Sequence, residues 1–532
     1  MVSARAATVA LAALALLAPP AQADRSENSW YRAGREAVAA RRAQLPAVGR
    51  AKNVILFVGD GMGISTITAA RILAGQQTGA SGEEHWLSFE RLPYTALSRT
   101  YNTNQQVPES SGTMTALITG VKTRAGSLSV DESVALGDFA ATAAHAVPTL
   151  IEEAEERGLA TGVVTNTTIT HATPAACYAH SPAREWEHDT ALSEAARAAG
   201  FPDLARQLVE FSKGDGLDVA LGGGRAHFRG KGQKDPESPD EESAAGVRTD
   251  GRDLTAEWRA RHPDGVYVWN RARFLALDPA RTRRVLGLFD PSHMKYEIDR
   301  AQDAGGEPSL TEMTDKAIRI LSRNPRGFVL MVEGGKIDHA HHATNAHRAL
   351  TETIELSNAV QRALELTSAS DTLIVVTADH SQPLVMSGYA VRGNPILGKL
   401  VVNDLDGKPM ETPLLDDLGR PMTTLTYPGG PGNVAESDLQ GTGPKKFPHY
   451  RPAYRGEYLP RPDLRKVDTT APDYLQESLL PLEAGMHAGE DVAIFAGGPG
   501  SELFTGVREQ NYVYHAIVEA LGWNPAPGAQ AP

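Results

Sequence analysis

Residues 328–342 join an apolar run to a cluster of potential metal ligands. The run 329–332 is short and has β-branched ends, which is typical of a buried strand, and the glycines after Glu333 let the chain turn into the next element. Beyond Asp338, apolar residues recur at helical spacing, so Asp338 and His342 are predicted to share one helix face. Two such side chains can hold one metal ion. The local alternative is a histidine-rich helix start that is only a solvated cap.

Composition limits the class of protein. With 532 residues, 41% of them hydrophobic, the chain can form one large α/β domain with insertions or two or three smaller domains. Its net charge of −13 argues against a general binder of nucleic acids or of anionic membranes. Its one cysteine, Cys177, excludes an intramolecular disulfide.

Residues 1–23 have the pattern of a secretory signal peptide. Arg5 precedes a short apolar run, and Ala21 to Ala23 form a small-residue cleavage site, although a buried first helix is the alternative. We therefore expect an exported protein, periplasmic or extracellular. Residues 24–51 are predicted to form an N-terminal arm helix, and residues 524–532 a flexible tail without a membrane anchor.

Apolar runs that lead to acidic residues recur along the chain. Residues 53–59 lead to Asp60 between glycines, and residues 372–377 lead to Asp379 and His380. Because such strands alternate with helical segments, we predict an α/β fold with a central, largely parallel sheet flanked by helices on both faces. In such sheets the site lies beyond the carboxyl ends of the strands. Locally, Asp60 as a cap of the following helix is an equal alternative.

The chain is predicted to consist of a core with one insertion. The core spans residues 52–387 and ends with residues 477–523. Between them, residues 388–476 are rich in Gly, Pro and Asp without a sustained period, which indicates an inserted irregular subdomain.

Small hydroxyl residues precede a predicted helix near residue 110. Ser110 would lie beside amide donors and the positive end of the helix dipole, which favour an anionic nucleophile or a bound phosphate. The local alternative is a simple N-cap.

Seven ligand-type side chains are predicted at one edge of the sheet: Asp60, Glu333, Asp338, His342, Asp379, His380 and His487. Mixed imidazole and carboxylate ligands suit zinc, and sites of oxygens alone suit magnesium. A serine needs a base or a cation to become a nucleophile, and no Ser-His-Asp motif is evident. Metal activation is therefore the simpler interpretation, with two zinc ions about 4 Å apart holding the attacking and leaving oxygens of a phosphoryl transfer.

Six motifs together resemble the alkaline phosphatase family: residues 59–63, 107–113, 171–175, 333–342, 377–381 and 487–492. The resemblance runs in unbroken order from about Lys52 to Leu521. It is greatest for the animal-type branch, judged by residues 288–291, 322–328 and 348–353.

The resemblance implies an enzyme that hydrolyses small phosphomonoesters through a phosphoserine on Ser110, with Arg184 binding the substrate phosphate, and it implies a homodimer. It implies two Zn²⁺, one Mg²⁺ and a remote Ca²⁺. The first zinc would bind Asp338, His342 and His487; the second Asp60, Asp379 and His380; magnesium Asp60, Thr173 and Glu333; and calcium Glu237, the Phe289 carbonyl, Asp290 and Glu307. His171 and His339 would tune the magnesium site from around it.

The chain departs from the family pattern in places. Glu109 replaces an aspartate before the nucleophile, and its longer arm is expected to reposition the Arg184 guanidinium. Gln382 stands where a histidine is usual, the disulfides and the lipid-anchor tail of the family are missing, and residues 388–476 match the crown of the animal branch poorly. Two rival functions follow: a phosphodiesterase or sulfatase of the same superfamily, and a non-catalytic protein that binds metal or phosphate.

Overall fold

The structure, a computed structural model, describes residues 49–417, 419–432 and 461–523. The predicted signal peptide (1–23), the predicted tail (524–532) and all but the last three residues of the predicted arm (24–51) lie outside the described residues. Within the described part, no helix combines the length and the apolar composition needed to cross a bilayer.

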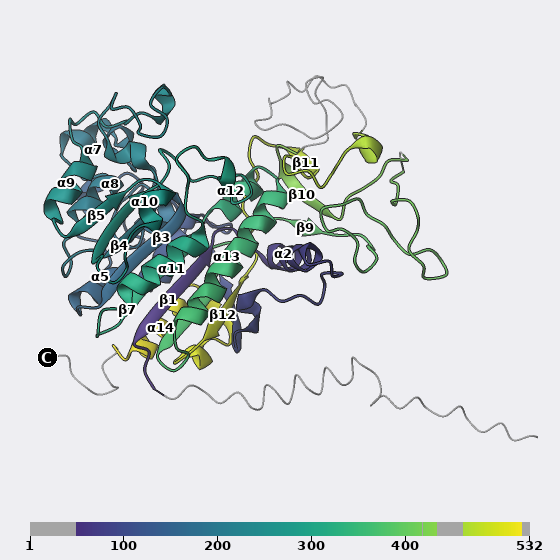
Figure 1. Cartoon of the computed structure of the whole chain (residues 1–532), viewed down its shortest axis with the longest axis horizontal. Coiled ribbons are helices and arrows are strands. Elements are labelled where there is room, and N and C mark those ends of the chain that lie inside the picture. Colours follow the sequence, from purple (N-terminus) through teal and green to yellow (C-terminus); the bar gives the residue numbers. More distant parts are fainter. Residues whose placement is uncertain (1–48, 418, 433–460, 524–532) are drawn as a thin grey trace, which may run out of the picture. The chain divides into compact units, whose positions relative to one another are not determined.

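A ten-stranded sheet lies at the centre of the core (Figure 1). Its strand order is β13-β2-β12-β8-β1-β7-β3-β4-β6-β5. Its strands are β1 (Asn53–Gly59), β2 (Tyr94–Arg99), β3 (Ala160–Thr168), β4 (Val219–Gly223), β5 (Gly265–Val268), β6 (Arg284–Leu288), β7 (Phe328–Gly334), β8 (Thr372–Thr377), β12 (Val492–Gly497) and β13 (Gly506–Glu509). In this sheet β12 runs antiparallel to both of its neighbours, and the other adjacent strands pair in parallel.

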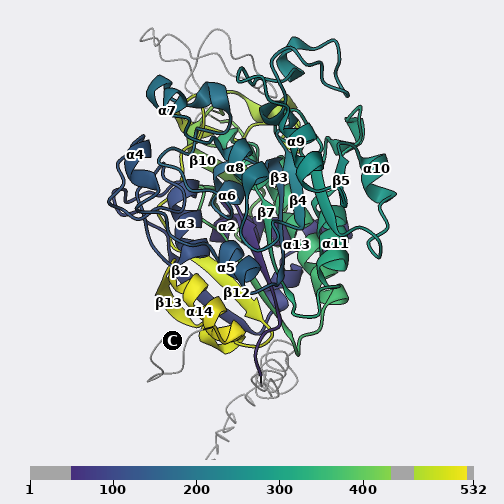
Figure 2. The ribbon, with the colours of Figure 1, turned by 90° about the vertical axis from the view of Figure 1, so that its left-hand side faces the viewer.

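Helices cover both faces of the sheet. They are α2 (Ile64–Gln77), α3 (Ser110–Thr119), α4 (Phe139–Thr142), α5 (Leu150–Glu156), α6 (Ala172–Ala175), α7 (Glu194–Ala198), α8 (Leu204–Glu210), α9 (Leu254–Arg261), α10 (Arg271–Leu275), α11 (Leu310–Leu321), α12 (Lys336–His342), α13 (Ala346–Leu366) and α14 (Tyr512–Leu521). One apolar core contains α2, α11 and α13, and the other contains α3, α5, α8 and α14, which face the viewer in Figure 2. The predicted fold class is confirmed.

The central strands β8, β1 and β7 position the candidate site. Residues 54–58 of β1 are at most 1% exposed, because neighbours flank the strand and helices cover both faces. Val58 is in register with Glu333 on one side and with Thr377 on the other. The carboxyl ends of these strands therefore bring Asp60, Glu333 and Asp379 to one edge of the sheet.

The helical segment predicted beyond Asp338 is divided into two helices, α12 and α13. Thr344 has a left-handed backbone (φ 54°), and Asn345 then caps α13 by accepting a hydrogen bond from the Arg348 N–H. His342 ends α12, so it still shares that helix with Asp338.

A second sheet has three strands in the order β11-β10-β9. They are β9 (Val385–Met386), β10 (Leu425–Gly430) and β11 (Ser478–Pro481). Only β10 falls within the predicted insertion 388–476, and the domain limits stay a prediction. A hydrogen bond between Tyr427 and His341 joins this sheet to α12, and one between His341 and Thr66 joins α12 to α2; the sheet lies beside both helices in Figure 1.

Candidate active site

Helix α3 begins at Ser110, and the residue before it caps the helix. The Glu109 carboxylate accepts hydrogen bonds from the backbone N–H groups of Ser111 (3.0 Å) and Gly112 (2.9 Å). The alternative of Ser110 as N-cap was therefore wrong. The Ser110 hydroxyl is buried and lies 3.2 Å from His380 Nε2.

Asp60, Asp379 and His380, here called the second metal group, lie together beyond β1 and β8. His380 Nε2 is 3.3 Å from Asp60 Oδ1 and 3.4 Å from Asp379 Oδ2. All three side chains are fully buried. Gly61 N–H donates to Asp379 Oδ1 at 3.2 Å, but neither oxygen of Asp60 has a hydrogen-bond partner among the described residues. Two buried carboxylate oxygens without a donor fit a bound cation.

Asp338, His342 and His487, the first metal group, meet between α12 and the loop before β12. His342 Nε2 lies 3.0 Å from Asp338 Oδ2 and 3.2 Å from His487 Nε2. The Nδ1 atoms of the two histidines face the carbonyls of Gly485 (2.5 Å) and Pro108 (2.8 Å), which require N–H on Nδ1. In neutral rings, both Nε2 lone pairs then point toward each other, which is the arrangement that a shared cation stabilises.

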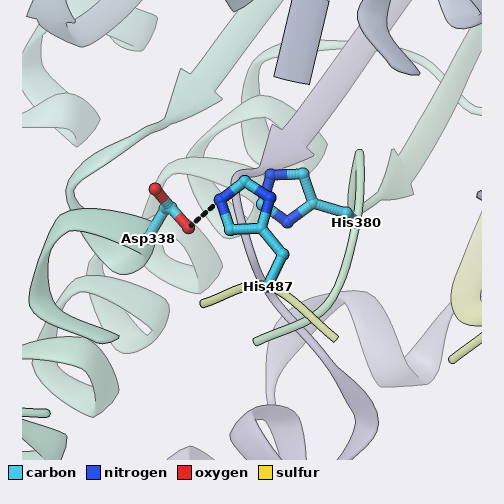
Figure 3. A group of neighbouring side chains, drawn as sticks. All are labelled: Asp338, His380 and His487. Atoms are coloured by element: carbon cyan, nitrogen blue, oxygen red, sulfur yellow. Dashed lines mark ion pairs between the residues drawn. The ribbon is translucent and has the colours of Figure 1, made fainter. Parts of the chain in front are cut away.

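His380 connects the first and second metal groups. Its ring stacks on the His487 ring with centroids 3.7 Å apart (Figure 3). Asp338, His380 and His487 each offer an atom within 4.8 Å of the others. His380 also lies within hydrogen-bond distance of Ser110, so the hydroxyl is adjacent to the ring that connects the two groups.

Asp60, Thr173 and Glu333, the third metal group, are fully buried. Thr173 Oγ1 and Glu333 Oε1 have no hydrogen-bond partner in the described part of the chain, while Glu333 Oε2 accepts one from Thr167 at 3.2 Å. His171, expected only around this site, offers an atom within 4.8 Å of Asp60 and Glu333. Unpartnered oxygens from three side chains fit a hard cation such as Mg²⁺.

Burial without a compensating charge strongly shifts the pKa values of several side chains in the metal groups. It raises the pKa of Glu333 to about 7 and that of Asp379 to about 6, and it raises the pKa of Asp60 well above its usual range. The same burial lowers the pKa of His380 and of His487 to about 4. Clustered carboxylates beside neutral imidazoles form a set that metal cations complete.

Arg184 lies between two acceptors. Its Nη1 donates to Glu109 Oε2 at 2.8 Å, and its Nη2 donates to His171 Nε2 at 3.0 Å. Glu109 therefore orients the guanidinium as well as capping α3. A fork held in this way can bind two oxygens of a phosphate.

Two neighbours were not assigned a role from sequence. Gln382 Nε2 donates to Asp338 Oδ1 at 2.5 Å, so the residue noted as a departure binds a ligand carboxylate. His293 packs edge-to-face on His339 and His171, with centroids 4.5 and 5.7 Å away. Its Nδ1 accepts a hydrogen bond from the Thr168 N–H (3.0 Å), and no spacing in the sequence indicated this contact.

The predicted calcium ligands are only partly gathered. Asp290 and Glu307 group with Asp303, a residue that the sequence did not single out. Glu237 instead pairs with the Arg225 guanidinium at 2.8 Å. Burial, and then the neighbouring Glu237 carboxylate, raise the pKa of Asp303 to about 7. The Phe289 side chain is buried in one of the two apolar cores.

The sequence pattern of the alkaline phosphatase family matches residues 51–523. The chain belongs to the alkaline phosphatase family. Its relatives include the tissue-nonspecific alkaline phosphatase of Gallus gallus, 43% identical over 479 residues that cover 89% of this chain and 85% of that protein. The alkaline phosphatase of Gadus morhua is 41% identical over 474 residues, which cover 88% and 92% of the two chains.

Solved alkaline phosphatase structures share the fold. The Thermus thermophilus enzyme superimposes with a TM-score of 0.61 at 24% identity, over 91% of this chain and 94% of that one. The enzyme of the Antarctic bacterium TAB5 gives 0.57 at 22% identity, over 90% and 100%. The resemblance inferred from the six motifs is confirmed. Alkaline phosphatases are metal-dependent enzymes, in keeping with the grouped ligand-type side chains at the end of the sheet.

Proposed function

We propose that this alkaline phosphatase hydrolyses phosphate monoesters to an alcohol and inorganic phosphate through a phosphoserine on Ser110. The observation that carries the proposal is the buried Ser110 hydroxyl, 3.2 Å from His380 at the start of a helix whose cap also holds Arg184. The helix N-terminus and the guanidinium both favour a phosphate dianion at this point.

The chain's residues divide the work. Ser110 Oγ forms the new bond to phosphorus while the bond to the alcohol oxygen breaks, and water later displaces the serine oxygen. Arg184 binds two phosphate oxygens, and Glu109 keeps its guanidinium oriented. The first and second metal groups would hold Zn²⁺, which would stabilise negative charge on the attacking and leaving oxygens, and the third group would hold Mg²⁺, which would supply further positive charge.

Replacing the nucleophile tests the proposal. We expect Ser110→Ala to lower the hydrolysis of p-nitrophenyl phosphate by about 10³-fold or more while its metal content stays unchanged. Thr119→Ala, which removes a hydroxyl at the far end of the same helix that bonds only to backbone groups, is the matched control and should retain most activity. A near-normal rate in Ser110→Ala would refute the assigned nucleophile.

Substrate comparison separates the rival functions. The arginine fork favours a monoester dianion, so rates on p-nitrophenyl phosphate should exceed those on bis-p-nitrophenyl phosphate and p-nitrophenyl sulfate. A preference for the diester or the sulfate would support the phosphodiesterase or sulfatase. Absence of any hydrolysis with zinc and magnesium supplied would support a non-catalytic binding protein.

The proposal extends to the assembly and its location. The protein is exported after removal of residues 1–23, acts in the periplasm or outside the cell, and forms a homodimer. A further Ca²⁺ is bound near Asp290 and Glu307, which group with Asp303. N-terminal sequencing, sedimentation and metal analysis of the purified protein test these points.

A further inference from the structure

His341 joins three elements through its two ring nitrogens. Its Nδ1 is 2.7 Å from the Tyr427 hydroxyl on β10, and its Nε2 is 3.0 Å from Thr66 Oγ1 on α2. The three residues are between 0% and 3% exposed. Each nitrogen of this buried imidazole therefore has one hydroxyl partner. Loss of either hydroxyl would leave one ring nitrogen without a hydrogen bond.

Residues after β10 and around β11 also form hydrogen bonds with the end of α12 and the residues just after it. Thr344 Oγ1 accepts a hydrogen bond from the Gly432 N–H (3.0 Å), and the Thr344 carbonyl accepts one from the Gln476 N–H (2.8 Å). Gly485 N–H donates to the His342 carbonyl at 2.7 Å, and the His342 ring donates to the Gly485 carbonyl. The three-stranded sheet and the chain next to it thus hold both the end of α12 and one of its ligand side chains.

Helix α12 is short and buried, so its polar contacts help to set its orientation. It has seven residues and ends at the break before α13, and Ile337, Ala340 and His341 are fully buried. His341 lies between the two α12 ligands in sequence, three residues after Asp338 and one before His342. A ring anchored on two sides therefore fixes the directions in which both ligands project.

We propose that Tyr427 is a positioning residue for the first metal group. Through His341 it holds α12 in the rotation at which Asp338 and His342 face His487, and Thr66 is the second anchor of the same ring. This inference rests on the proposed function only for the identity of the bound metal. It makes the insertion a determinant of metal affinity at the active site, although no ligand lies on β10.

Zinc affinity of the metal-free protein tests this role directly. Full-length protein is stripped with a chelator and titrated with Zn²⁺ against a chromophoric zinc indicator. Because loss of a residue that orients a metal ligand typically weakens binding 10- to 100-fold, we expect Tyr427→Phe and Thr66→Val each to weaken one zinc equivalent by about tenfold. The remaining equivalents should bind as in the wild type.

Two control variants distinguish loss of the anchoring hydroxyls from a general disturbance of the fold. Tyr474→Phe removes a buried hydroxyl that has no partner among the described residues, near the same segment, and Thr66→Ser keeps the anchoring hydroxyl. Both should bind zinc as the wild type does. Unchanged affinity in Tyr427→Phe, or an equal loss in Tyr474→Phe, would overturn the proposal.

A double variant tests whether the two hydroxyls act through one ring. The double variant Tyr427→Phe/Thr66→Val should bind zinc only slightly more weakly than the single variant with the lower zinc affinity. The reason is that both substitutions act on His341. Fully additive losses would refute the shared anchor. If the wild type binds zinc yet hydrolyses no phosphate ester, the proposed function fails while these binding results still decide the role of Tyr427.

Discussion

Glu109 serves three structural purposes with one carboxylate. It caps α3, accepts a hydrogen bond from the Gly126 N–H at 2.8 Å, and pairs with Arg184. Although burial opposes its charge, the Arg184 guanidinium and these hydrogen bonds lower the pKa of Glu109 to about 2. The residue that departs from the family pattern is thus built into both the nucleophile helix and the phosphate clamp.

This shift predicts an acid-dependent loss of stability. A carboxyl group whose pKa falls from 4.5 to about 2 on folding stabilises the protein fully above about pH 4.5, and the contribution disappears as the pH falls toward 2. We expect metal-free wild type to lose about 1–3 kcal/mol more unfolding free energy than Glu109→Gln between pH 5 and pH 3. Urea unfolding at both pH values measures it. The exposed Glu502→Gln should behave as the wild type, and equal losses in wild type and Glu109→Gln would contradict the prediction.

The sequence predicted which residues could bind metal better than it predicted the side chains that contact them. Asp60, Asp379 and His380 could be placed because each follows an apolar strand, and parallel strands end at one edge. The contacts of Gln382 and His293 could not be predicted, because each meets a residue distant in sequence through a side chain whose direction no local pattern specifies.

The turn between β1 and α2 brings backbone against the metal groups. Gly61 has a left-handed backbone (φ 68°), its N–H binds Asp379, and its carbonyl accepts from the Gln382 N–H at 3.1 Å. A Cβ there would lie 2.8 Å from Gln382 Cγ and 2.9 Å from Asp338 Oδ1. Only glycine lets this turn pass so close to two ligand carboxylates.

Gly61→Ala should therefore weaken zinc binding as well as stability. The left-handed backbone alone costs a non-glycine residue about 1–2 kcal/mol. Gly79→Ala shares that cost (φ 83°) but its Cβ would meet nothing within 4 Å, so it is the matched control. We expect both variants to lower the melting temperature through backbone strain, Gly61→Ala more so because of the overlap, and zinc affinity to fall in Gly61→Ala alone. Equal zinc affinity in the two variants would exclude a role of the close approach.

At the level of elements, the sequence indicated strands more reliably than helix ends. Continuous apolar runs predicted β1, β7 and β8, because strands buried on both faces need apolar residues throughout. The division between α12 and α13 occurs at Thr344, which is neither glycine nor asparagine. Its left-handed backbone is stabilised by hydrogen bonds from Gly432 and Gln476, which are remote in sequence, so local propensity gave no sign of it.

For the molecule as a whole, burial of carboxylates at the sheet edge links metal to stability. Without cations, burial raises the pKa values of Asp379 and Glu333 to about 6 and 7. A carboxyl group whose pKa is raised on folding stabilises the protein below its unfolded pKa near 4, and this contribution is lost as the pH rises through 6 to 7. Metal ions bind the ionised forms, so their stabilising effect grows over the same range.

Chelation should therefore destabilise the protein more at pH 8.5 than at pH 5.5. We expect the difference in melting temperature between metal-loaded and metal-free protein to widen by several degrees over that interval. Thermal scans with and without chelator measure the difference. Glu333→Gln, which removes one buried charge, should narrow the change with pH. If the melting-temperature difference between metal-loaded and metal-free protein did not change with pH, these carboxylates would not be what links metal binding to stability.

The first and second metal groups draw their side chains from Asp60 at one end of the chain to His487 near the other, and β12, which follows His487, is inserted between β8 and β2. A nascent polypeptide therefore cannot assemble both metal groups until the residues from Asp60 to His487 have all been synthesised. We expect ribosome-bound fragments that stop before residue 487 to be inactive.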